Sequence, residues 1–119
     1  MLKIIRSFFR EKTLINAIPR YIIFKVLNLK YLKKYNTLNG SFYLPFFAFK
    51  DVIRNTIINN KIYEEEVYNA VKEHIKPNSI VLDIGSNYGQ MSILWSKVKP
   101  GVQVYSFEAS SYISTILKK

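Results

Sequence analysis

The chain has 119 residues, 49% hydrophobic and 22% charged, which corresponds to about one globular domain and excludes a disordered chain. It contains no cysteine and one histidine, His74. The sequence therefore excludes disulfides and thiolate or histidine-rich metal sites, and we predict no metal ion. The formal net charge of +10 is unevenly distributed. Residues 1–61 hold 12 Lys and Arg against 2 Asp and Glu, whereas residues 62–119 hold 6 of each kind.

The basic excess thus lies entirely in the first half, which indicates a separate interaction surface there. No run of about 20 apolar residues is present, and charges interrupt every apolar core that an export signal would need, so we expect a cytoplasmic protein. Three interpretations of the basic half stay open. It is a cap or lid, a segment that contacts a membrane surface through residues 1–35, or a nucleic-acid surface, for which no recognition motif is present.

The first half predicts helices followed by an extended segment. Apolar residues at helical spacing on both sides of Pro19 predict two short basic amphipathic helices within residues 1–35. Residues 36–41 predict a turn, because Asn and Gly tolerate positive φ. The aromatic run 42–49 contains a proline and is expected to be extended. Residues 51–62 fit a helix or a strand, and their Asn-Asn pair predicts a turn.

In the second half of the chain, helical and strand patterns alternate. Three glutamates are expected in the first turn of its first helix, and Pro77 is expected to stop that helix. The apolar run 79–84 is typical of a strand that is buried on both faces. The predicted elements are helix, strand, helix, strand and helix, over residues 63–76, 79–84, 91–98, 102–107 and 112–117. This alternation predicts an α/β fold with a parallel sheet, and Ser110 or Ser111 is expected to cap the last helix.

A glycine-containing turn, IGSNYG, follows the first predicted strand. Gly85 and Gly89 can adopt positive φ, and Asn87 is among the few other residue types that do so at low cost. Asp83 precedes this turn, and Glu108 ends the second predicted strand, where a carboxylate can accept hydrogen bonds from a ribose diol. Ligands of open parallel sheets bind beyond the carboxyl ends of the strands, so these residues predict a nucleoside site.

Two kinds of nucleoside compete for this turn. A dinucleotide needs glycine at the positions that Asn87 and Gln90 occupy, and Asp83 would repel its diphosphate. S-adenosylmethionine has no phosphate and carries an ammonium group and a sulfonium, so an acid beside the turn favours it. A nucleotide-binding α/β domain of another type stays open as an alternative.

Three segments in this order resemble the FkbM family of S-adenosylmethionine-dependent methyltransferases: Tyr63-Glu64, VLDIGSNYG and VYSFE. The resemblance covers roughly residues 62–110 and implies that S-adenosylmethionine is the cofactor. It implies that Glu108 holds the ribose hydroxyls and that the methionine end is lined by Asp83, Gly85, Ser86, Asn87 and Gly89. Ser86 stands where Ala is usual in the family, and Ala109 stands where Pro is usual. Without the family, Tyr63 and Glu64 are expected to be a core aromatic and a first-turn acid, with cofactor contact as the alternative.

The resemblance also implies O-methyl transfer to a hydroxyl of a sugar, a glycan or another small metabolite. A class I methyltransferase has a Rossmann-like seven-stranded sheet, of which residues 62–119 predict the first two strands behind a basic helical N-terminal extension over residues 1–61. We therefore expect a truncated or partial methyltransferase domain, and no catalytic residue is assigned. The alternative from another class is a non-catalytic basic module that binds a membrane surface or nucleic acid.

Overall fold

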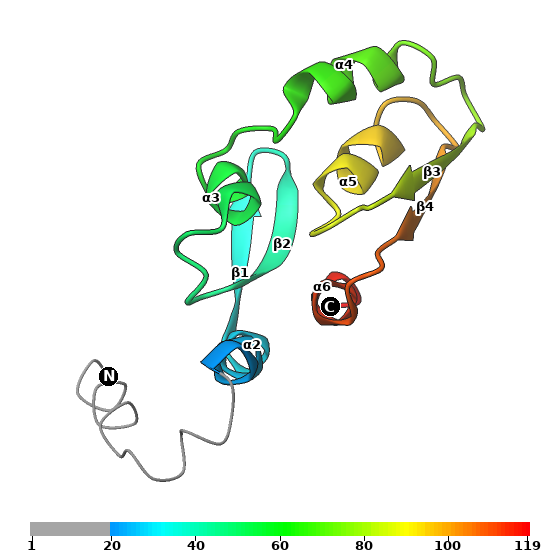
Figure 1. Ribbon diagram of the computed structural model, residues 1–119. Coiled ribbons are helices and arrows are strands. Elements are labelled where there is room, and N and C mark those ends of the chain that lie inside the picture. Colours follow the sequence, from blue (N-terminus) through cyan, green and yellow to red (C-terminus); the bar gives the residue numbers. More distant parts are fainter. Residues whose placement is uncertain (1–19) are drawn as a thin grey trace, which may run out of the picture.

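The computed structural model describes residues 20–119, which form two small sheets of two strands each with helices around them (Figure 1). In chain order the elements are α2 (Arg20–Lys30), β1 (Leu32–Thr37), β2 (Gly40–Pro45), α3 (Val52–Ile58), α4 (Glu65–Lys72), β3 (Ile80–Ile84), α5 (Gln90–Ser96), β4 (Gln103–Phe107) and α6 (Ser111–Leu117). The predicted α/β class is confirmed in this coarse sense. The helix that is predicted before Pro19 lies outside the described residues.

An antiparallel hairpin of β1 and β2 corrects the prediction for the end of the basic segment. Helix α2 ends at Lys30, and residues 32–35, which helical spacing had placed in a helix, belong to β1. Their backbone pairs with β2, whose Phe42 and Leu44 are buried, so the strand is stabilised by a partner that is distant in sequence. The predicted turn shrinks to residues 38–39, and the predicted extended run ends at residue 45.

Helix α3 resolves the ambiguous segment that follows the hairpin. The side chain of Asp51 accepts a hydrogen bond from the backbone N–H of Arg54 and so caps the helix. The predicted Asn-Asn turn is confirmed, because Asn60 has a φ of 60°. The next helix, α4, ends at Lys72 and not at Pro77, which corrects that prediction. Backbone hydrogen bonds between residues three apart tighten the chain after it, well before the proline is reached.

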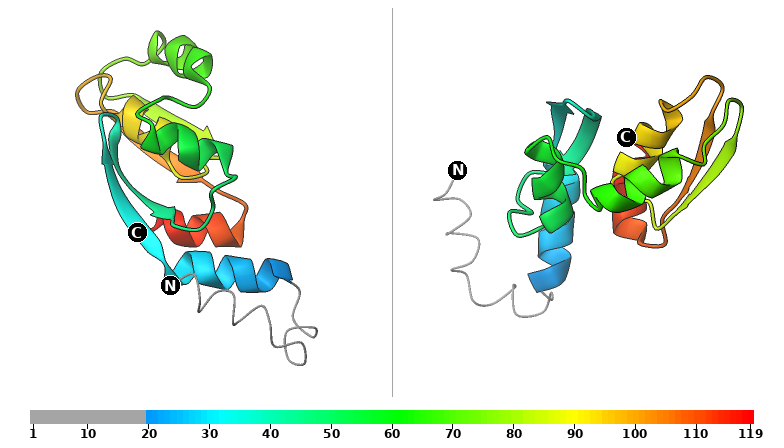
Figure 2. Two further views of the ribbon diagram at one scale, coloured as in Figure 1. Left: turned by 90° about the vertical axis from the view of Figure 1, so that its left-hand side faces the viewer. Right: turned by 90° about the horizontal axis from the view of Figure 1, so that it is seen from above.

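The strands β3 and β4 pair in parallel, as predicted, with Asp83 opposite Ser106. Helix α5 packs against both strands on one side of this sheet, as Figure 2 shows. On the other side Ile80, Leu82 and Ile84 are exposed, with 81% of Ile84 accessible. The prediction that this strand is buried on both faces is therefore wrong for the described residues. The crossover helix covers one face, and no described element covers the other.

A hydrophobic core joins the two halves of the chain. Its buried members are Phe42, Leu44, Ile57, Tyr88 and Ile116. Tyr88 belongs to the glycine turn, and its hydroxyl donates a 2.6 Å hydrogen bond to Asp51 Oδ2. Burial raises the pKa of Tyr88 well above its usual range, and the bond to Asp51 adds to that shift. The cap of α3 and the glycine turn of the second half are thus held together by one buried contact.

The Tyr88→Phe substitution tests this contact. It keeps the ring in the core and removes the donor to Asp51, so we expect unfolding to require about 1–3 kcal/mol less free energy. The measurement is urea unfolding, with the exposed Tyr43→Phe as the matched control, for which we expect a change below about 0.5 kcal/mol. Equal stabilities of the two variants would contradict the assigned role of Tyr88.

Stability should also fall at high pH. Burial raises the pKa of Tyr112 from 10.0 to about 12, and the negative charge of Asp51 adds to the shift. Tyrosine ionises near pH 10 in an unfolded chain, so this contribution is complete below about pH 10 and is lost between about pH 10 and 12. Urea midpoints measured across this range should fall less steeply for Tyr112→Phe than for the natural chain. An unchanged slope would show that Tyr112 does not contribute.

Candidate functional site

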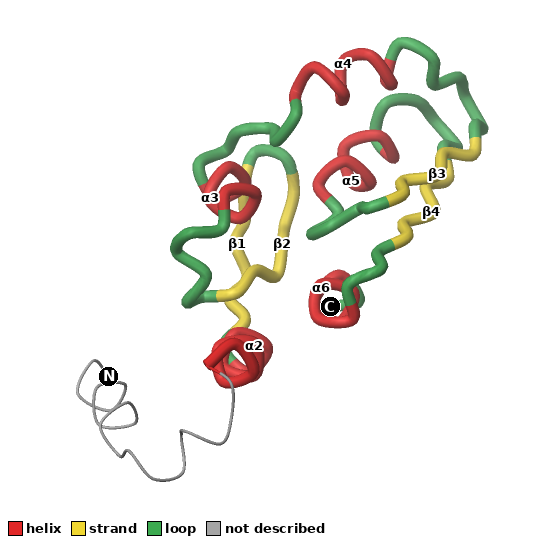
Figure 3. The backbone as a smooth tube through the Cα atoms, in the orientation of Figure 1, coloured by secondary structure: helices red, strands yellow, loops and turns green. Residues whose placement is uncertain are grey.

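The glycine turn connects β3 to α5, in the loop between these elements in Figure 3. The predicted backbone conformations are confirmed, since φ is 83° at Gly85, 49° at Asn87 and 79° at Gly89. A side chain at Gly89 would lie 2.7 Å from Leu117 Cδ1, so this end of the turn lies against α6. At Gly85 nothing lies within 4 Å of the position a Cβ would take, which leaves space for a ligand.

The turn uses its own backbone N–H groups internally. Those of Gly85 and Ser86 both donate to the carbonyl oxygen of Phe107, at 2.8 and 3.1 Å. Three more N–H groups follow the same pattern: Asn87 donates to Glu108 Oε2, Tyr88 to Asn87 Oδ1, and Gly89 to the carbonyl oxygen of Ser86. A phosphate-binding loop presents such groups to its ligand. This turn differs from one, because all five donors are already engaged.

Glu108 fixes the turn relative to the end of β4. Its Oε2 accepts from the N–H of Asn87 at 2.9 Å, and its Oε1 accepts from the N–H of Ser110 at 2.8 Å. The Ser110 side chain caps α6, as one of the two predicted alternatives. This cap and the bond from the Ser110 N–H to Glu108 together fix the backbone on both sides of Ala109. The carboxylate is therefore held in place although proline is absent there, and each oxygen retains a further lone pair.

Asp83 is buried and is oriented by serines that the sequence analysis did not single out. The hydroxyl of Ser92 on α5 donates to Asp83 Oδ2 at 2.5 Å, and it lies 2.5 Å from the hydroxyl of Ser106 on β4. Oδ1 of Asp83 accepts no hydrogen bond from the described residues. The signal that could have found Ser106 is its register, because it lies opposite Asp83 in the parallel pair of strands.

A cavity of about 350 Å³ lies beside the turn and brings several predicted residues together. Among the residues that line it are Tyr63, Glu64, Asp83, Gly85, Ser86 and Asn87. Two of the six predicted cofactor residues lie elsewhere: Gly89 faces α6, and Glu108 lies behind Asn87 and does not line the cavity. The structure thus brings Tyr63-Glu64 to the glycine turn, as the alternative of cofactor contact requires.

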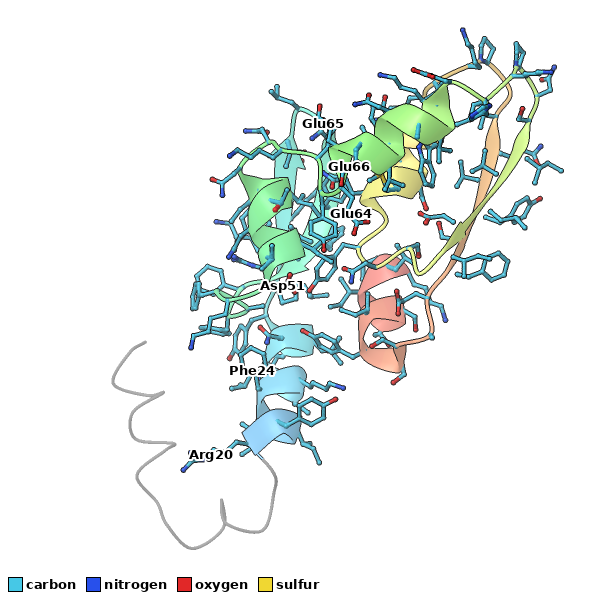
Figure 4. The ribbon with its side chains drawn as sticks, turned by 45° about the horizontal axis from the view of Figure 1, so that its top comes forward. Arg20, Phe24, Asp51, Glu64, Glu65 and Glu66 are labelled. Atoms are coloured by element: carbon cyan, nitrogen blue, oxygen red, sulfur yellow. The ribbon has the colours of Figure 1, made fainter. Side chains whose placement is uncertain are left out.

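Glu64 departs from the role of a first-turn acid. It occupies the N-cap position of α4 with a left-handed backbone, φ 53°, and its side chain makes no capping hydrogen bond. Glu65 and Glu66 are the acids in the first turn, and Figure 4 shows the three side chains at the start of α4. A left-handed conformation is costly for a residue with a side chain and is concentrated at functional sites. Its exposed carboxylate is available to a ligand of the cavity.

Gln90 attaches the Tyr63 segment to the turn. Its buried side chain accepts a hydrogen bond from the N–H of Tyr63 at 2.9 Å and donates to the carbonyl oxygen of Lys61 at 2.8 Å. In the sequence, Gln90 indicates only that a dinucleotide is disfavoured. The structure gives this residue a positioning role, which a sequence does not reveal because its partners are 27 and 29 residues away.

Comparison with known proteins gives no match for this chain among family models, curated proteins or solved structures. Within residues 20–119, no group of three or more acidic or histidine residues is arranged to hold a metal ion. In the same part of the chain, no helix has both the length and the hydrophobicity that crossing a bilayer requires.

The Gln90→Ala substitution tests the attachment of the Tyr63 segment. It leaves a backbone donor and acceptor without their buried partner, so we expect a loss of about 1–3 kcal/mol in stability and faster amide exchange at Tyr63. Hydrogen exchange measured by NMR checks this, with the exposed Gln103→Ala as control. Unchanged exchange at Tyr63 would refute the positioning role of Gln90.

Proposed function

We propose that the cavity beside the glycine turn binds S-adenosylmethionine and that the chain is the cofactor-binding part of an FkbM-like methyltransferase. One observation carries the proposal. All five N–H groups of the turn are engaged internally, while two acidic residues, Glu64 and Asp83, are among those that line the cavity. A cavity that is lined by acidic residues, beside a turn whose own N–H groups are engaged, suits a cationic ligand that has no phosphate better than a nucleotide or dinucleotide.

The residues of the cavity fit this cofactor. A volume of about 350 Å³ falls in the range of small-molecule sites, and Gly85 leaves the approach to the turn open. Asp83 and Glu64 would hold the ammonium and sulfonium end. The side-chain nitrogen of Asn87 donates to no described residue and would bind the carboxylate of the methionine portion.

The remaining assignments follow the resemblance to the FkbM family. Ser86 and Gly85 would pack against the methionine portion, and Gly89 would support the turn from the side of α6. Glu108 would accept the ribose hydroxyls through the lone pairs that Asn87 and Ser110 leave free. Because Glu108 does not line the cavity, its contribution to binding is expected to be smaller than that of Asp83.

The proposed chemistry is transfer of a methyl group to an oxygen. Bound S-adenosylmethionine would supply a methyl group to a hydroxyl oxygen of a sugar, a glycan or another small metabolite. The C–S bond would break as the C–O bond forms, S-adenosylhomocysteine would leave as a neutral thioether, and the hydroxyl proton would pass to solvent. The residues of this chain hold and orient the cofactor, and such positioning supplies a large part of the rate in reactions of this class. None of the described residues is assigned the role of a base for the acceptor. The acidic residues that line the cavity would also repel a bound anion. The cofactor's positive charge would therefore be paired with protein carboxylates.

Titration with S-adenosylmethionine tests this proposal. Trp95 is the chain's single tryptophan and lines the cavity, so its fluorescence should change on binding. We expect saturable binding of S-adenosylmethionine and none of ADP or NAD. Asp83→Asn, which keeps an acceptor for Ser92 but removes the charge, and Glu64→Gln should each weaken binding by roughly tenfold or more. Calorimetry provides an independent measurement.

The exposed Glu73→Gln at the end of α4 is the matched control, because it removes one charge outside the cavity and should leave the affinity unchanged. Binding of ADP as tight as that of S-adenosylmethionine would favour the alternative of a nucleotide-binding domain. Binding that Asp83→Asn and Glu64→Gln do not alter would refute the assignment of the cavity.

A further inference from the structure

Helix α2 presents large apolar side chains to solvent. Tyr21 and Val26 are 64% and 56% exposed, and Ile22 and Phe24 are exposed as well. Ile22 and Val26 are four residues apart and so lie on one face of the helix. The helix packs against α6, and Figure 4 shows the side chain of Phe24 on the side away from α6. Phe24 is two residues from both Ile22 and Val26 and so lies on another flank of the helix, which leaves apolar side chains open to solvent on two flanks. The ring of Tyr21 lies under Lys25 Nζ.

An aromatic loop extends this apolar surface beyond the C-terminal end of α2. The rings of Tyr31 and Phe47 pack edge to face with their centroids 5.6 Å apart, and the N–H of Phe47 donates to Asn28 Oδ1 on α2. Beside them Phe49 is 63% exposed. The loop is thus fixed to the helix, and together they form what we term the α2 surface. Its exposed apolar side chains are Tyr21, Ile22, Phe24, Val26, Tyr31 and Phe49.

The same part of the chain is uniformly basic. Residues 20–50 contain no Asp or Glu, and their basic residues are Arg20, Lys25, Lys30, Lys33, Lys34 and Lys50. Arg20 and Lys30 lie at the two ends of α2, and Lys50 directly follows Phe49. The next acid, Asp51, is engaged by Tyr88 and by the N–H of Arg54. No carboxylate within this segment offsets its positive charge.

We propose that the α2 surface docks on a lipid bilayer that carries anionic headgroups. Anionic lipids attract each nearby Lys or Arg by about 1 kcal/mol, and apolar side chains beside such charges insert to the boundary of the acyl region. Tyr and Trp side chains are enriched at this depth of a bilayer. The proposal concerns residues outside the cofactor cavity and does not depend on the proposed methyltransferase function.

The aliphatic side chains favour a membrane over nucleic acid. Single-stranded nucleic acid is bound by basic grooves with aromatic rings on which bases stack. Ile22 and Val26 offer no such stacking, yet both are exposed on α2. A bilayer accommodates both the aliphatic and the aromatic side chains, and it supplies the negative charge that the lysines require.

Co-sedimentation of the full chain with vesicles tests the proposal. We expect binding to phosphatidylcholine vesicles that contain phosphatidylglycerol, little binding to phosphatidylcholine alone, and a marked loss between about 0.1 and 0.5 M salt. Arg20→Glu with Lys30→Glu should weaken binding about thirtyfold or more. Ile22→Ser with Val26→Ser should weaken it about tenfold or more while leaving the charge unchanged.

Two control variants match these changes elsewhere on the surface. Lys76→Glu with Lys99→Glu alters the net charge by the same amount, and Ile80→Ser with Leu82→Ser removes two exposed apolar side chains from the β3–β4 sheet. Both should leave vesicle binding within about threefold of the natural chain. Circular dichroism verifies the fold of each variant. The dependence of vesicle binding on lipid composition and salt is measured on the natural chain, so that part of the test holds even if a variant fails to fold.

Three results would overturn the proposal. The first is binding that does not depend on phosphatidylglycerol. The second is binding to RNA or DNA that is tighter than binding to vesicles and is unaffected by Ile22→Ser with Val26→Ser. The third is a dimer in solution that this double variant dissociates, without vesicle binding by the natural chain, because the surface would then be an interface between two copies.

Discussion

The junction between the glycine turn and the end of β4 is the constraint on which the rest of the structure depends. Positive φ at Gly85, Asn87 and Gly89 bends the chain so that its N–H groups meet the carbonyl of Phe107 and the carboxylate of Glu108. This junction fixes where α5 begins. Were the turn built from residues that avoid positive φ, these bonds would be lost together and no cavity would form beside Asp83.

The internal use of these donors decides the chemistry of the cavity. A glycine turn at a strand end is usually read as an anion site, because its N–H groups are free. Here the protein's own acceptors have taken that place, and the acidic residues Glu64 and Asp83 line the cavity beside the turn. Asp83 is buried with Ser92 as its hydroxyl donor, so it retains the capacity to pair with a positively charged group. The preference for a cation that we propose thus follows from the turn's own hydrogen bonding.

Local signals in the sequence predicted the elements whose cause is local. The glycines and Asn87 predicted the turn, the serines near residue 110 predicted a cap, and alternation of patterns predicted the parallel pair. Strand β1 escaped prediction because Lys33 and Lys34 continue the spacing of a basic helix, and its true cause is pairing with β2. The exposure of one face of β3 was not predicted, because an apolar run in the sequence does not reveal how many elements will cover the strand.

The site was predictable in its backbone and less so in its side chains. One cavity is lined by Asp83, Gly85, Ser86 and Asn87. This agrees with the rule that ligands of parallel sheets bind beyond the carboxyl ends of the strands. The contacts that complete the site cross long distances in sequence. Gln90 reaches back to residues 61–63, and Tyr88 reaches Asp51. No periodicity or motif encodes such pairs.

Not every basic residue of the first half contributes to its surface charge, and Arg54 is the example. It is buried, and its guanidinium donates to the carbonyl oxygens of Pro45 and Phe46 and to the hydroxyl of Tyr35. Its guanidinium carbon lies 5.7 Å from the ring centre of Phe49. Arg54 therefore organises the aromatic loop from inside, and it contacts exposed Phe49, which Lys50 follows in the chain. A buried cation thus shapes the surface whose exposed cations we assign to lipid contact.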